Sequence, residues 1–166
     1  MTVTIKKQAV IDQWGTIVEH GAGREKWVLD TTEKLINEAK MPGIAVKQDQ
    51  ATMGMFGTKR NFVIVGNQAL KEFYMFIGAR DYGMHLDACW YLTLFTSGFK
   101  SAMSRRMTGN PHAFSMNMSM FGQQDLRAFV TVANHCFRQA LDQLYGELKI
   151  TPKGLDTRST GFLSVW

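Results

Sequence analysis

Residues 60–95, RNFVIVGNQALKEFYMFIGARDYGMHLDACWYLTLF, decide the fold. β-Branched and aromatic residues recur here in short runs, and turn-forming residues separate the runs. The runs, with a similar one before them, are residues 44–53, 60–66, 72–78 and 86–95. The turn signals are Gly54 and Gly57, Gly66-Asn67, and Asp81-Tyr82-Gly83. Because connections this short favour antiparallel neighbours, the stretch predicts a four-stranded antiparallel meander.

A fifth strand is predicted from strict alternation between Phe114 and Met120. Apolar and polar residues alternate at every position of this segment. The apolar set is Phe114, Met116, Met118 and Met120, and the polar set is Ser115, Asn117 and Ser119. Alternation of period two places the first set on a buried face and the second toward solvent.

Three helices complete the predicted fold. Residues 123–147 carry an apolar residue every three or four positions, which is typical of a long amphipathic helix. A second helix is predicted over 24–40, and a first helix before Gly21, where Val10, Trp14 and Val18 follow helical spacing. The sequence therefore predicts an α+β fold: an antiparallel sheet of about five strands, two N-terminal helices and one long C-terminal helix.

Length and composition are consistent with one domain over residues 1–166, with a tail at 151–166. Apolar runs such as 62–65 are far shorter than the roughly 20 residues of a membrane-spanning helix. No apolar stretch follows Lys6 and Lys7, so we expect no signal peptide and a cytoplasmic location. The formal net charge of +5 favours acidic partners, nucleic acid among them.

Both faces of the predicted sheet are apolar in its middle strands. Phe73 and Met75 alternate with Tyr74 and Phe76, so large apolar side chains point both ways. A soluble monomer rarely leaves such a face in water. Three coverings are open: the N-terminal helices on one face with the long helix on the other, a second copy of the chain, or a ligand in a curved sheet.

Motifs for catalysis or metal binding are weak. His85, Asp87 and Cys89 share one strand face, but the spacing is not that of a common zinc site. His135 and Cys136 are neighbours on a helix and point about 100° apart, which suits a nucleophile and its base poorly. We therefore predict no catalytic residue, no metal and no cofactor, and we expect a protein that is not an enzyme.

The leading functional hypothesis is a non-enzymatic binding domain that acts through its apolar sheet face and self-associates. The candidate contact residues are Tyr74, Phe76, Arg80, Trp90, Tyr91, Phe162 and Trp166. The C-terminal tail can pair with a free sheet edge of its own chain or of a neighbour. One alternative is a nucleic-acid module, with aromatic rings for bases beside Lys59, Arg60 and Arg80. The other is a small-ligand protein or enzyme, with a pocket between sheet and long helix near Trp90, Tyr91, Cys89 and His135.

Overall fold

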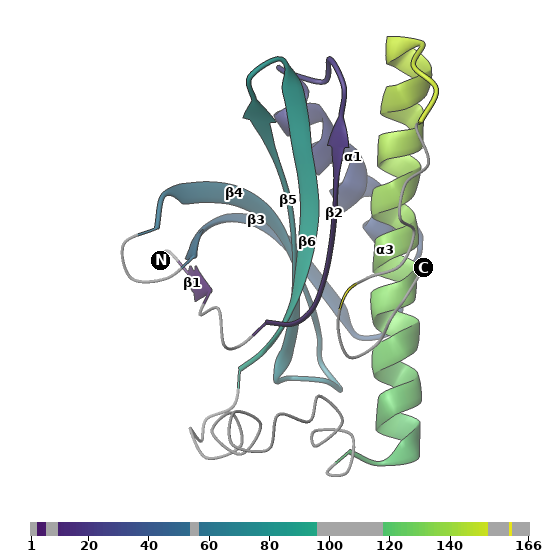
Figure 1. Cartoon of the computed structure of the whole chain (residues 1–166). Coiled ribbons are helices and arrows are strands. Elements are labelled where there is room, and N and C mark those ends of the chain that lie inside the picture. Colours follow the sequence, from purple (N-terminus) through teal and green to yellow (C-terminus); the bar gives the residue numbers. More distant parts are fainter. Residues whose placement is uncertain (1–2, 6–9, 54–56, 96–117, 153–159, 161–166) are drawn as a thin grey trace.

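The computed structural model describes residues 3–5, 10–53, 57–95, 118–152 and 160. Within them the chain forms six strands and two helices, shown in Figure 1. The strands are β1 (Val3–Ile5), β2 (Val10–Val18), β3 (Ile44–Met53), β4 (Lys59–Asn67), β5 (Phe73–Tyr82) and β6 (His85–Leu94). The helices are α1 (Glu25–Glu38) and α3 (Met120–Leu148).

The described strands form one sheet in the order β1-β3-β4-β5-β6-β2. Its centre is the predicted meander, in which β3, β4, β5 and β6 pair antiparallel in sequence order. The outer pairings correct the prediction of a purely antiparallel sheet. Although β2 is antiparallel to β6, β1 runs parallel to β3, so the sheet is mixed.

The predicted first helix is wrong, because residues Val10–Val18 form the strand β2. Its Trp14 lies opposite Trp90 of β6, and Val18 lies opposite Leu86. Trp14 and Val18 are buried, whereas Gln13 and Ile17 point to the other face and are exposed. Pairing with β6 satisfies the backbone of this segment and buries the residues that suggested a helix. The fold thus has one N-terminal helix, α1, which confirms the second of the two predicted helices.

The long C-terminal helix is confirmed as α3, and the predicted apolar stripe on it, which includes Phe129 and Phe137, is buried. It begins at Met120, where the Ser119 hydroxyl caps it by accepting a hydrogen bond from the Gly122 amide at 3.0 Å. Residues 114–117 of the predicted fifth strand lie outside the described residues, and 118–120 form no strand. Phe162 and Trp166 also lie outside them.

Helices α1 and α3 lie on the same side of the sheet and contact each other, as Figure 1 shows. They cover the main core, where the rings of Trp14 and Phe137 meet edge to face at 6.1 Å. The Trp90 indole N–H also donates to the Asn134 side-chain oxygen at 2.9 Å within this core. Of the three coverings left open by the sequence, the one with helices on opposite faces is therefore wrong. The sheet curls into a half-barrel whose β3 and β4 bend away from α3 (Figure 1).

Candidate functional site

The second face of the sheet, opposite α1 and α3, carries an apolar cluster of its own. Phe62, Ile64 and Phe76 are buried there together with Ile5 of β1 and Ala51 of β3. Aromatic rings continue the cluster, with centroid distances of 6.0 Å for Phe62–Phe76 and 6.3 Å for Phe76–Phe95. These side chains are buried in the single chain, so they do not need a second molecule to leave water.

The structure brings together three of the predicted contact residues on this second face. Tyr74, Phe76 and Tyr91 lie there, and Tyr74 is 37% exposed and packs edge to face on Phe95 at 5.7 Å. Trp90 points the other way and is fully buried beneath α3, where it bonds Asn134. Of the three, Tyr74 is the most exposed, although most of its surface is still covered.

Arg80 also lies on the second face, but its charge is already paired. Its Nε donates to a carboxylate oxygen of Asp87 at 2.8 Å, and its guanidinium carbon lies 5.4 Å from the centroid of the Tyr82 ring. Lys59 and Arg60 at the start of β4 are exposed. By strand alternation Arg60 shares the second face with Phe62 of the aromatic cluster, whereas Lys59 points to the opposite face.

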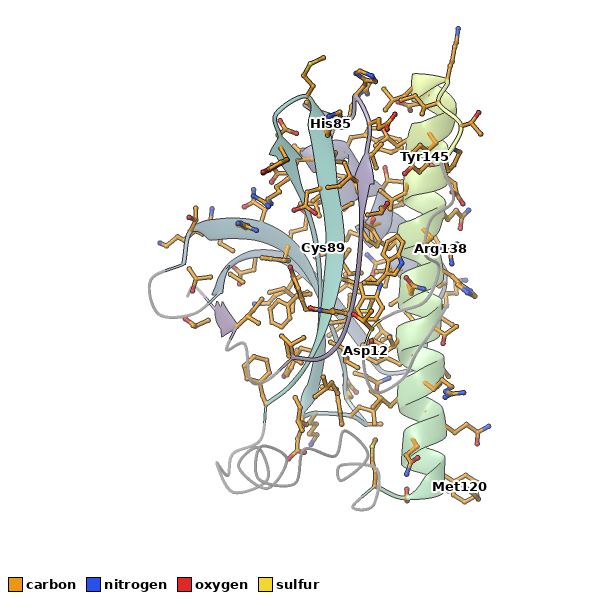
Figure 2. The ribbon with its side chains drawn as sticks, viewed as in Figure 1. Asp12, His85, Cys89, Met120, Arg138 and Tyr145 are labelled. Carbon is orange, nitrogen blue, oxygen red and sulfur yellow. The ribbon has the colours of Figure 1, made fainter. Side chains whose placement is uncertain are left out.

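His85, Asp87 and Cys89 share a face of β6, as predicted, and each has a partner other than a metal. The His85 Nδ1 accepts from the His20 amide at 3.3 Å, and the Cys89 thiol lies 3.6 Å from the Tyr91 hydroxyl oxygen. Figure 2 shows His85 near the end of β6 and Cys89 near its middle. Among the described residues, no group of three His, Cys, Asp or Glu side chains is placed to hold a metal ion.

Burial raises the pKa of the Cys89 thiol above its ordinary value, and burial likewise raises the pKa of Tyr91. The thiolate is the nucleophilic form of cysteine, so a raised pKa leaves little of it at neutral pH. Cys136 on α3 is buried as well, and burial raises its pKa in the same direction. Both thiols are therefore suited to packing rather than to catalysis.

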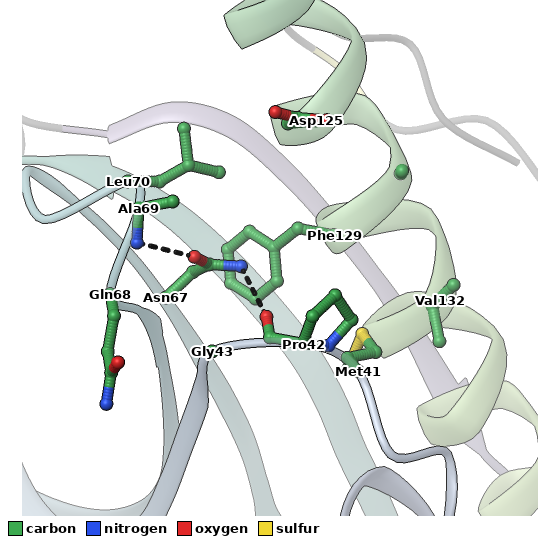
Figure 3. Close-up of a pocket in the computed structure, with 11 residues that line it drawn as sticks. Met41, Pro42, Gly43, Asn67, Gln68, Ala69, Leu70, Asp125, Phe129 and Val132 are labelled. Atoms are coloured by element: carbon green, nitrogen blue, oxygen red, sulfur yellow. Dashed lines mark hydrogen bonds between the residues drawn. The ribbon is translucent and has the colours of Figure 1, made fainter.

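A cavity of about 450 Å³ opens on the helix side of the sheet. We call it the loop–helix cavity, and Figure 3 shows it from close by. Three segments form its walls: the connection from α1 to β3, the turn from β4 to β5, and the first half of α3. Its lining residues are Met41, Pro42, Gly43, Asn67, Gln68, Ala69, Leu70, Asp125, Ala128, Phe129 and Val132.

The two loop walls are tied together by the Asn67 side chain, as the dashed lines in Figure 3 mark. Its amide nitrogen donates to the Pro42 carbonyl oxygen at 3.3 Å, and its amide oxygen accepts from the Ala69 N–H at 2.9 Å. The Gln68 amide adds a 2.8 Å bond to the Gly43 carbonyl. The bonds to Pro42 and Gly43 join the two loops, whereas the bond from Ala69 holds the β4–β5 turn itself.

The third wall is fixed by the packing of α3. Phe129 is buried in the main core while one side of its ring faces the cavity, and Val132 packs against the same core. Ala128 and Asp125 lie on the exposed side of the helix. Phe129 on this wall is therefore held by the core, whereas Ala128 and Asp125 can be substituted without disturbing the core.

A pocket between sheet and long helix was one of the sequence-based alternatives, but different residues line the cavity found. Trp90 lies in the core, Cys89 and Tyr91 lie on the second face, and His135 is exposed on α3. Sequence reasoning missed Asn67, which it interpreted only as a turn residue. The one available signal was the position of Asn67 and Pro42-Gly43 at the ends of the meander strands.

Comparisons with protein-family models, with curated proteins and with solved structures found no match to this chain. Neither helix in the described part of the chain is long and apolar enough to cross a membrane.

Proposed function

We propose that this protein binds a small, largely apolar molecule in the loop–helix cavity. The observation that carries the proposal is an apolar cavity of about 450 Å³ whose two loop walls are locked by Asn67. Small-molecule sites are commonly preformed concavities of about 300–1,000 Å³ with a few polar groups among apolar walls. The cavity matches this description in size and in lining.

Binding is favoured over catalysis by the side chains that line the cavity. They supply one carboxylate, from Asp125, and two amides, from Asn67 and Gln68. The described lining contains no cysteine, serine, histidine or lysine, the side chains that most often act as nucleophile or base. A lone exposed carboxylate can orient a ligand more readily than it can drive a reaction on one.

The binding experiment uses 2-phenylethanol as a neutral apolar probe and calorimetry as the measurement. Ala128→Phe fills the cavity from an exposed helix position, so we expect it to remove binding while leaving the fold intact. Gln139→Phe adds the same ring at another exposed position of α3, outside the lining, and should bind like the wild type. Equal affinity in all three proteins would contradict the proposal.

Self-association is a second candidate, favoured by exposed apolar side chains near the β5–β6 turn. Tyr82 is 62% exposed, Met84 is 66% exposed, and Ile17 of the neighbouring β2 is 49% exposed. Contiguous exposed apolar groups on a soluble protein mark interaction sites. If a second copy covers them, the mass in solution should exceed 18.8 kDa and should fall to that value in a Tyr82→Ser, Met84→Ser double variant.

A further inference from the structure

We infer that the ligand of the loop–helix cavity carries a cationic group, an ammonium on an alkyl or aryl body, and that Asp125 binds this group. The inference rests on the proposed function, since it concerns the same cavity. Asp125 supplies the only ionisable side chain among the described residues that line it. Which polar group a ligand can carry depends on the polar side chains of the lining that are not already hydrogen-bonded within the protein.

Most polar groups of the two loops are already used within the protein. Both polar atoms of the Asn67 side chain are bonded, and the carbonyl oxygens of Pro42 and Gly43 each accept a hydrogen bond. The Asn67 carbonyl accepts from the Leu70 amide at 3.0 Å as well. Among the polar side chains of the described lining, those left for a ligand are the exposed amide of Gln68 and the carboxylate of Asp125.

The Asp125 carboxylate has no ion-pair partner in the described part of the chain. Lys40 and Lys71 flank the two loops in sequence, yet neither is bridged to Asp125 there. A carboxylate accepts hydrogen bonds and does not donate them, so the group that it binds must be a donor. A charged donor makes the stronger bond, which favours an ammonium over a hydroxyl.

Helical spacing puts an aromatic residue within reach of this carboxylate, although it is not itself part of the cavity lining. Phe121 lies four residues before Asp125 on α3 and is 74% exposed, and residues four apart on a helix are neighbours on its surface. An organic cation gains from an aromatic face as well as from a carboxylate. Its apolar body would then lie against Phe129, Leu70 and Met41 inside the cavity.

The cation preference runs against the charge of the whole protein. The formal net charge is +5, so long-range electrostatics alone would favour anionic ligands. No lysine, arginine or histidine is among the described lining residues, and a carboxylate ligand would face Asp125 with like charge. If the protein binds cations more tightly than anions, the cause must therefore be the lining of the cavity and not the net charge of the protein.

The test compares three probes of one shape: 2-phenylethylammonium, 2-phenylethanol and 3-phenylpropanoate, each titrated at low salt. We expect the wild-type protein to bind the ammonium about three- to tenfold more tightly than the alcohol, and the carboxylate most weakly. Asp125→Asn should remove most of the preference for the ammonium over the alcohol, and Asp125→Lys should reverse the order toward the carboxylate. Asp142→Asn removes a carboxylate from an exposed position of α3 outside the cavity and should keep the wild-type order.

The two proposals fail in different ways. If all three probes bind equally and Ala128→Phe removes their binding, the cavity is a ligand site and the cation inference is wrong. If the ammonium preference keeps its full wild-type size in Asp125→Asn, another group binds the cation and the inference is again overturned. If no probe binds wild-type protein, the proposed function itself is contradicted.

Discussion

The ring of Phe62 lies over Gly78, its partner across β4 and β5, so closely that a Cβ on Gly78 would come within 2.6 Å of the ring. Phe62 in turn meets Phe76 edge to face at 6.0 Å. Glycine at this strand position therefore lets an aromatic ring lie flat on the second face. The relationship helps to explain how the curled sheet buries an aromatic cluster on a face that neither helix of the described residues covers.

Replacing Gly78 by alanine should destabilise the protein by about 1–3 kcal/mol, because the buried Phe62 ring must move out of its place. Urea unfolding measures the change. Gly146→Ala is the matched control, since a Cβ there meets nothing within 4 Å. That residue lies in α3, where alanine in place of glycine should stabilise by about 0.5–1 kcal/mol. If the two substitutions change the free energy of unfolding equally, the packing of the Phe62 ring does not require glycine at position 78.

The hydrogen bond between Trp90 and Asn134 predicts strong coupling across the main core. Both residues are buried, and the indole N–H donates to the Asn134 oxygen at 2.9 Å. Asn134→Leu should cost about 1–3 kcal/mol because it leaves a buried donor unpaired. In a Trp90→Phe background the same change should cost much less, which a double-mutant cycle measures. Additive costs would mean that the bond does not stabilise the fold.

Asn67→Ala should loosen the loop–helix cavity by removing the side-chain bond to the Pro42 carbonyl, which joins the two loops, and the bond from the Ala69 amide, which holds the β4–β5 turn. We expect a loss of about 1 kcal/mol in stability and weaker binding of 2-phenylethanol, because the cavity is no longer preformed. Gln68→Ala shortens a neighbouring lining side chain and leaves the loop bonds intact, so the affinity for this neutral probe should change less. Calorimetric titration of both variants against wild type separates these outcomes.

The stability of the fold should fall as the pH rises above about 9. Burial raises the pKa of Cys89 above its ordinary value of 9.0 and that of Tyr91 above its ordinary value of 10.0. The unfolded chain therefore loses these protons at a lower pH than the folded protein, which favours unfolding as pH rises. Tyr91→Phe should reduce the fall in free energy of unfolding between pH 9 and 11, the range that we would scan by urea titration.

The C-terminal tail is predicted to act within its own chain. The Thr160 amide donates to the Gln13 carbonyl of β2 at 2.7 Å, so this residue reaches the last strand of the described sheet. Deleting residues 161–166 should lower the melting temperature and leave the mass in solution unchanged. A smaller mass with little thermal change would instead assign Phe162 and Trp166 to a contact between copies.

Sequence periodicity was sufficient to predict the secondary structure of an element where the element is long and its pattern fits only one type of structure. The meander and α3 were predicted for this reason, since turn residues and a three-to-four spacing mark them clearly. In β2 the spacing of Val10, Trp14, Ile17 and Val18 fits a helix, and only pairing with β6 makes it a strand. Because Trp14 and Trp90 lie 76 positions apart in the chain, the pairing of β2 with β6 cannot be predicted from the local sequence pattern.

The coverage of the second face and the cavity also depend on contacts distant in sequence. The alternation of Tyr74 and Phe76 with Met75 correctly indicated a sheet that is apolar on both faces. What buries Phe76 is the curl of the sheet with Ile5 and Ala51, a consequence of pairing between β1 and β3. Likewise, Asn67 contributes to the cavity because its side chain bonds the Pro42 carbonyl, and no sequence motif predicts this bond between two loops.

The most direct test of the central claim is where a bound probe perturbs the protein. In amide NMR spectra of the whole chain titrated with 2-phenylethylammonium, we predict that the shifting signals come from Met41, Gly43 and residues 67–70 and 125–132. Ala128→Phe should abolish those shifts, and Gln139→Phe should preserve them. Shifts confined to β4, β5 and β6 on the second face, or unaltered by Ala128→Phe, would contradict the loop–helix cavity as the binding site.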